Sequence, residues 1–130
     1  MDKDAIEQLR QRTKKFALRI ITLHDALPHS GAAYVIGNQL LRAGTSVGAN
    51  YRAVCRARSD AEFAAKMGVV VEEADESLYW LELLDAAAIL PSRRLSALLK
   101  EAEELVRIFA SARQTARGRL RKSTNQPVNP

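Results

Sequence analysis

Two segments of this sequence alternate spacings of three and four residues between mostly apolar positions. That spacing returns side chains to one face of an α-helix and predicts a continuous stripe for packing against other helices. The first stripe, on a helix predicted over about residues 3–26, is Ile6, Leu9, Thr13, Phe16, Ile20, Leu23 and Leu27. The second, on a helix predicted over about residues 92–117, is Leu95, Leu98, Ala102, Leu105, Phe109 and Ala112. Pro28 and Pro91 mark breaks beside these helices, because the residue before a proline is disfavoured in the α conformation.

Two more helices are predicted between these breaks. Ser30 is a plausible N-cap for a helix over about residues 31–57, and Ser59-Asp60-Ala61-Glu62 is a capping box for a helix ending near residue 89. Three glycines inside the second helix, Gly37, Gly44 and Gly48, predict the close approach of another backbone, since each costs about 1 kcal/mol relative to alanine.

These elements predict an all-α fold, an antiparallel up-down-up-down four-helix bundle over residues 1–118. Gly118 is a reasonable helix stop, and residues 119–130 are predicted to be a basic, disordered tail. A chain of 130 residues suits one domain. It contains no run of about 18 apolar residues, begins with no apolar leader and has a single cysteine, Cys55. We therefore expect no membrane association and a cytoplasmic location.

The third predicted helix is apolar on more than one face, which indicates a second burial surface. In a domain this small, another subunit is the expected partner, so we predict a homo-oligomer. A wide core face with some exposed apolar residues is the alternative. The predicted interface residues are Tyr79, Trp80 and Leu83.

A polar network is predicted between the second and third helices. If the chain turns near residue 58, positions whose numbers sum to about 118 face each other. The network comprises Arg42, Ser46 and Asn50 on one helix and Glu72, Glu73 and Glu76 on the other. We interpret it as a structural network that fixes the register of the helices, and a ligand or ion site is the alternative.

No catalytic, metal or cofactor site is predicted. Di-metal bundles use Glu-x-x-His pairs, and neither His24 nor His29 has a glutamate three residues before it. Cys55 lies in a basic stretch that could activate a thiol, but no histidine is placed by sequence to serve it. The glycine-rich phosphate-binding motifs are absent as well.

Positive charge is concentrated near two predicted helix ends. Residues 59–90 contain one basic and eight acidic groups, whereas residues 91–130 contain nine basic and three acidic groups. Cations at helix C-termini interact favourably with the helix dipole. The second cluster has more cations than this interaction requires, which predicts contact with phosphate groups. The candidate nucleic-acid-binding residues are Arg52, Arg56 and Arg58 in the first cluster and Arg113, Arg117, Arg119, Arg121 and Lys122 in the second.

Several short stretches of the sequence resemble those of a known protein family. The stretches are S-V-G-A-N-Y-R-A from Ser46, R-A-R-S from Arg56, E-F from Glu62 and E-E-A-D-E-S-L-Y-W-L-E-L-L from Glu72. They resemble the bacterial four-helix bundle proteins also called 23S rRNA intervening-sequence proteins, over about residues 5–112. The resemblance implies a four-helix bundle that assembles into a ring-like homopentamer. Some members are encoded inside extra segments of ribosomal RNA genes.

A related group of accessory proteins of diversity-generating retroelements binds nucleic acid and partners a reverse transcriptase. The leading hypothesis is therefore a non-enzymatic, pentameric protein that binds RNA or DNA with weak sequence specificity or serves as an accessory protein. The alternative is a protein–protein adaptor whose basic groups meet an acidic partner.

Overall fold

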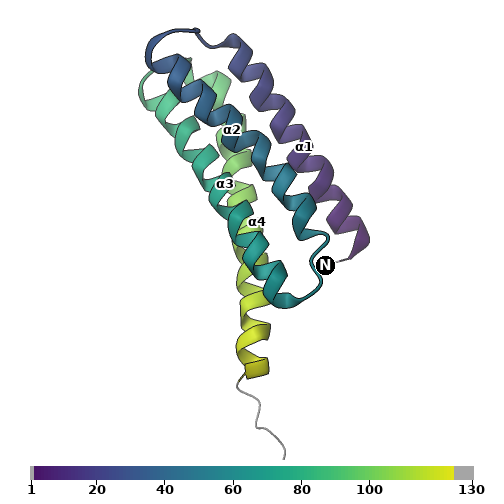
Figure 1. Ribbon diagram of the computed structural model, residues 1–130. Coiled ribbons are helices and arrows are strands. Elements are labelled where there is room, and N and C mark those ends of the chain that lie inside the picture. The colour runs from purple at the N-terminus through teal and green to yellow at the C-terminus, as the bar shows by residue number, and fades with distance from the viewer. Residues whose placement is uncertain (1, 125–130) are drawn as a thin grey trace, which may run out of the picture.

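The computed structural model describes residues 2–124, and within them the chain forms four α-helices and no strand (Figure 1). This confirms the predicted all-α class with four helices. None of the described helices has the combination of length and hydrophobicity that a membrane span requires. The helices are α1 (Lys3–Ala26), α2 (Gly31–Val54), α3 (Asp60–Ala86) and α4 (Ser92–Thr124).

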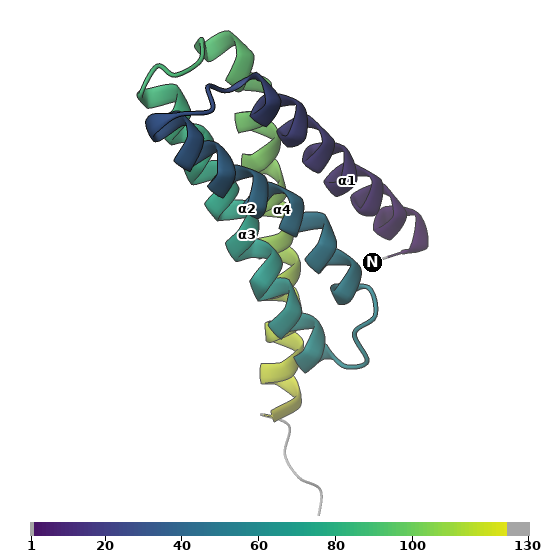
Figure 2. The ribbon, with the colours of Figure 1, turned by 45° about the horizontal axis from the view of Figure 1, so that its top comes forward.

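Each helix packs along the next one in the chain, and the chain turns back at each short connection (Figures 1 and 2). Contacts are extensive between α1 and α2, between α2 and α3, and between α3 and α4. By contrast, α1 and α4 touch only over a small area. The bundle is therefore closed tightly on three sides and loosely on the fourth.

The core forms where the apolar stripes of the four helices meet. Phe16 and Ile20 of α1 and Leu105 and Phe109 of α4 are fully or almost fully buried. Tyr51 of α2 stacks at a tilt on Phe109, with ring centroids 5.3 Å apart. Burial of such side chains supplies most of the stability of amphipathic helices in a bundle.

The helix starts agree with the sequence prediction in most respects. Ser59 is the N-cap of α3, and its hydroxyl accepts a hydrogen bond from the Glu62 backbone N–H at 3.1 Å. The Glu62 carboxylate, however, pairs with Lys66 one turn later, at 3.1 Å. Ser30 occupies the N-cap of α2 but makes no capping hydrogen bond through its side chain.

The three glycines of α2 allow α1 to approach closely, which confirms one part of the sequence prediction. A Cβ atom on Gly44 would lie 2.8 Å from Cγ1 of Ile20, and one on Gly48 would lie 3.5 Å from a backbone atom of Thr13. The atoms nearest to Gly37 and Gly44 belong to side chains of the α1 region. The glycines therefore make room chiefly for α1 side chains rather than for its backbone.

The prediction for the end of the chain was wrong in one respect. The last helix does not stop at Gly118 but continues to Thr124, so residues 119–124 do not form a disordered tail. Gly118 has no left-handed backbone conformation, and the residues after it are good helix formers. Leu120 is half-buried, which further holds the helix against the bundle. The remainder of the predicted tail, residues 125–130, lies outside the described residues.

Candidate nucleic-acid interface

Both predicted arginine clusters lie at the same end of the molecule. This is the end where α2 ends, α3 begins and α4 ends (Figures 1 and 2). The last turns of α4 extend beyond the other helices there. We call this the arginine end, defined by Arg52, Arg56, Arg58, Arg113, Arg117, Arg119, Arg121 and Lys122.

Three arginines of α4 form a row on one face of the helix. Arg113, Arg117 and Arg121 are four residues apart and line one surface cavity of about 300 Å³ together with Gln114. Spacing by four residues places their successive Cα atoms about 6 Å apart along the helix axis. The row is therefore held by a helix and not by a flexible arm.

The other two cations of the second cluster have different surroundings. Arg119 projects toward the start of α3, where its Nη2 lies 3.3 Å from a carboxylate oxygen of Asp60. Lys122 is exposed. The five cations that the sequence grouped together therefore do not share one face, because residues six and nine positions after Arg113 point away from its side of the helix.

Arg113 is anchored more deeply than its neighbours. Its guanidinium lies against Gly68 of α3, where an added Cβ would be 3.2 Å from Cζ. Its Nε atom is buried and has no hydrogen-bond partner among the described residues. Gly68 therefore makes the space that Arg113 occupies, a pairing that helical periodicity alone does not reveal.

Arg52 belongs to a second basic groove, between α1 and α2. The groove has a volume of about 560 Å³, and Arg10 and Lys14 of α1 line it with Arg52. Glu7 is the acidic residue in its lining and lies 3.9 Å from Arg10. Sequence reasoning missed Arg10 and Lys14, because nothing local connects α1 to the end of α2. Arg56 and Arg58 are exposed in the connection to α3.

The predicted polar network forms around Arg42. One guanidinium nitrogen of Arg42 donates to Glu73 at 3.3 Å, and another forms a short hydrogen bond with Glu76. The hydrogen bond from Arg42 lowers the pKa of the Glu76 carboxyl, and the indole N–H of Trp80 contributes further, at 3.3 Å. This arrangement links α2 to α3.

The other members of the predicted network do not bridge the helices. The Ser46 hydroxyl donates to the Arg42 carbonyl at 2.7 Å, and the Asn50 amide donates to the Ser46 carbonyl at 2.9 Å. Both bonds lie within α2. Glu72 is exposed and has no ion pair among the described residues. Short polar side chains often bond back to their own helix in this way.

The three predicted interface residues differ in exposure within the single chain. Tyr79 is 54% exposed, whereas Trp80 and Leu83 are half-buried. Tyr79 and Trp80 meet edge to face, with ring centroids 5.1 Å apart. A large aromatic side chain at this exposure leaves apolar surface available to a partner.

The histidines and the cysteine have ordinary surroundings. His24 Nε2 lies 2.9 Å from Oδ1 of Asn38, and His29 is exposed. Cys55 is half-buried one turn after Tyr51, and burial raises the pKa of the Tyr51 hydroxyl. Among the described residues, no three histidine, cysteine or carboxylate side chains gather closely enough to hold a metal ion.

An ion-pair cluster that the sequence did not predict connects α1 to α4. Arg12 donates to both carboxylate oxygens of Glu101, at 2.9 and 2.7 Å, and to Glu104 at 2.7 Å. These hydrogen bonds, first of all those to Glu101, raise the pKa of Arg12. Residues so far apart in the chain can be paired only once the topology is known.

Comparison with known proteins places this fold in a family. The model of the 23S rRNA-intervening sequence protein family matches residues 7–111. A crystal structure of a protein of unknown function from the S23 ribosomal protein family, from Bacteroides thetaiotaomicron, is 32% identical. The match covers 79% of this chain and 95% of that chain, with a TM-score of 0.73. No curated protein matches the chain. The chain belongs to the 23S rRNA-intervening sequence protein family.

Proposed function

We propose that this protein is a non-enzymatic, homopentameric protein that binds nucleic acid through the arginine end of each bundle. The observation that carries the proposal is the convergence of the two arginine clusters on one end of the molecule. Residues far apart in the sequence thereby supply cations to the same end of the bundle. Such cations bind phosphate groups by releasing the counterions condensed on nucleic acid.

The side chains at this end are suited to backbone contact. Arg52, Arg56 and Arg117 are exposed and form no ion pair among the described residues. Guanidinium groups form paired hydrogen bonds with phosphate oxygens, which lysine does not. Charges that are not already neutralised contribute most to phosphate binding.

Weak sequence specificity follows from the same surface. Specific readout requires side chains that reach base edges or aromatic rings that stack on bases. The large apolar side chains most exposed in the described chain are Leu18, Ile21, Tyr34, Val35, Val69 and Tyr79, and none belongs to the arginine end. The expected contacts are therefore with the backbone of RNA or DNA.

Self-assembly would strengthen this binding. Each added copy repeats the arginine end, and several weak contacts held together give avidity that one copy lacks. A pentamer is the assembly that the family resemblance implies. Exposed apolar side chains on α3, above all Tyr79, support association between copies.

Fluorescence anisotropy with labelled RNA and DNA tests the proposal. Wild-type protein should bind both at about 50 mM salt, and log affinity should fall linearly with log salt concentration. The variant Arg52→Gln/Arg117→Gln removes one exposed cation from each cluster. Its affinity should be lower and its salt slope shallower by up to about two, since each lost phosphate contact removes roughly 0.9 from the slope on duplex DNA.

The matched control is Arg93→Gln/Lys100→Gln, which removes two exposed cations near the opposite end of α4. It has the same net charge and should bind almost as the wild type does. If both variants lost the same affinity, the loss would be explained by net charge and not by the position of the cations. No binding by the wild type at low salt would overturn the proposal and favour the adaptor with an acidic protein partner.

A further inference from the structure

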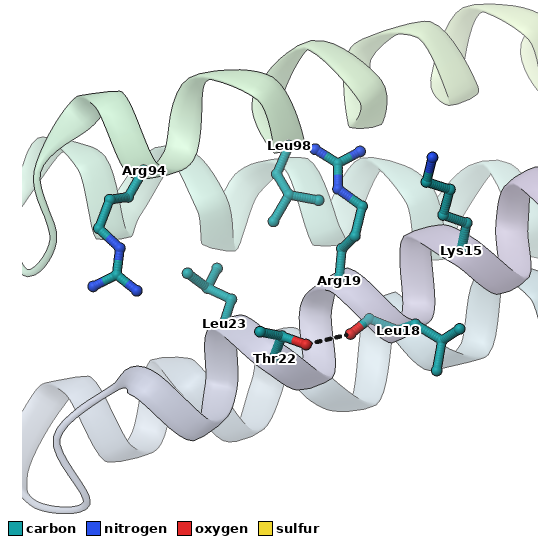
Figure 3. A pocket seen from close by; sticks show the side chains of 7 residues that line it. All are labelled: Lys15, Leu18, Arg19, Thr22, Leu23, Arg94 and Leu98. Carbon is teal, nitrogen blue, oxygen red and sulfur yellow. Dashed lines mark hydrogen bonds between the residues drawn. The ribbon is translucent and has the colours of Figure 1, made fainter.

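A groove follows the loosely packed side of the bundle, between α1 and α4. It has a volume of about 360 Å³, and Leu23 and Leu98 form its apolar base (Figure 3). Leu18 also lines it and is 55% exposed. Leu23 and Leu98 are buried, so Leu18 supplies most of the apolar surface that the groove leaves in contact with water.

The charged residues of this groove are all basic. Lys15, Arg19 and Arg94 line it, and no acidic residue does. None of the three forms an ion pair within the described part of the chain. Figure 3 shows Arg94 reaching from α4 while Lys15 and Arg19 rise from α1. The groove therefore fits an apolar ligand that carries negative charge.

A surface with the opposite character lies on α3 of the same chain. Glu72, Asp75, Tyr79 and Glu82 follow one another at spacings of three and four, and all four are exposed. The three carboxylates form no ion pair among the described residues. We call these four residues the acidic stripe. Its three acids match the three cations of the groove, and Tyr79 supplies an aromatic ring for the apolar base.

We propose that the groove between α1 and α4 binds the acidic stripe of a second copy of this chain. This inference rests on the self-association proposed above and identifies the two surfaces that meet. In the described part of the bundle α1 and α3 are not neighbouring helices, and the stripe lies on the exposed side of α3. A chain therefore cannot fill its own groove.

The proposed contact joins two different surfaces and is head-to-tail. Each copy offers one groove and one stripe, so association continues until the rotation closes a ring. Opposite charges on the two surfaces favour this pairing, while stripe against stripe or groove against groove would place like charges together. None of the residues that line the groove belongs to the arginine end.

Sedimentation equilibrium of two charge-reversal variants tests the pairing. The groove variant is Arg19→Glu/Arg94→Glu, and the stripe variant is Glu72→Arg/Glu82→Arg. Each variant alone should associate at least about tenfold more weakly than the wild type, because like charges then meet in every contact. Combining all four substitutions in one chain should restore assembly, since every reversed groove then meets a reversed stripe, whatever the number of copies in the ring.

Controls separate the possible outcomes. Arg19→Lys/Arg94→Lys keeps the charges and should assemble as the wild type does, and circular dichroism should show the same helix content in every variant. Assembly that survives in either charge-reversal variant, or a lack of assembly in the chain that carries all four substitutions, would overturn this pairing and leave self-association standing. A monomeric wild type at micromolar concentration would overturn both.

Discussion

Arg12 of α1 holds Glu101 of α4 through two hydrogen bonds of 2.9 and 2.7 Å. The Glu101 side chain is 16% exposed and that of Arg12 is 34% exposed, so solvent screens the pair only in part. Because α1 and α4 otherwise touch over a small area, this pair is the main polar link across the open side of the bundle.

Replacing Arg12 by alanine should destabilise the fold by roughly 1 kcal/mol, because Glu101 then loses two charged hydrogen bonds while staying partly buried. Urea unfolding followed by circular dichroism measures this change. The control is Arg10→Ala, which removes an exposed cation 3.9 Å from Glu7 on the same helix. That variant should stay within about 0.5 kcal/mol of the wild type. Equal losses would show that the Arg12 pair has no special role.

The Glu76 carboxylate should make stability depend on pH. Its pKa in the folded protein lies below the ordinary value of 4.5, first because Arg42 donates to it. A group with a lowered folded pKa adds stability above its unfolded pKa, and that stability is lost as pH falls through the folded pKa. At pH 7, Glu76→Gln should therefore be less stable than the wild type, by up to about 1 kcal/mol for a partly exposed pair.

The difference in unfolding free energy between wild type and Glu76→Gln should shrink as pH falls below 4.5. Denaturant titrations at pH 7, 5, 4 and 3 would follow it. Glu72→Gln, a change at an exposed residue on the same helix, serves as the control and should show a small difference at every pH. A Glu76→Gln difference that does not change with pH would contradict the proposed linkage.

Two glycines should respond unequally to replacement by alanine. At Gly44 the new Cβ would lie 2.8 Å from Ile20, a fully buried branched residue that has no room to move. Overpacking of this kind costs roughly 1–3 kcal/mol, more than the gain of about 1 kcal/mol in helix propensity. At Gly68 the new Cβ would meet the guanidinium of Arg113, the far end of a flexible side chain.

Thermal and urea unfolding should therefore show Gly44→Ala to be clearly less stable than the wild type. Gly68→Ala should stay within about 1 kcal/mol, because the helix propensity gained offsets the displacement of Arg113. If Gly68→Ala were the more damaging of the two, Arg113 would have to be held more rigidly than its surroundings indicate.

The fold was largely predictable because its signals are local. The two stripes that contain Phe16 and Phe109, the break at Pro28 and the Ser59 cap each depend on residues within a few turns. The end of α4 could not be predicted in this way, because Gly118 is compatible with both the end of a helix and a helix that continues. What decided it was the local helix preference together with the half-burial of Leu120.

The candidate site was predicted as a set of residues but not as an arrangement. Charge clustering identifies Arg52 and Arg117 without knowledge of the fold, yet it does not show that their helices end together. The groove partners Arg10 and Lys14 and the pairing of Arg12 with Glu101 depend on how α1 lies against α2 and α4. Such contacts are long-range, so no local pattern in the sequence predicts them.

Two neighbouring arginines of α4 should contribute unequally to nucleic-acid binding. Arg117 lines the cavity with Arg113 and has no ion pair among the described residues, whereas Arg119 pairs with Asp60 at 3.3 Å. A phosphate that binds Arg119 must compete with that carboxylate. Arg117→Gln should therefore lower affinity more than Arg119→Gln, with the larger reduction in salt slope, although both remove one charge. Anisotropy titrations of both variants over a salt series measure this.

The variant Asp60→Asn removes the carboxylate that competes for Arg119. In that background, Arg119→Gln should lower the affinity for nucleic acid as much as Arg117→Gln does. If the effect of Arg119→Gln were the same with and without Asp60, the proposed competition would be wrong.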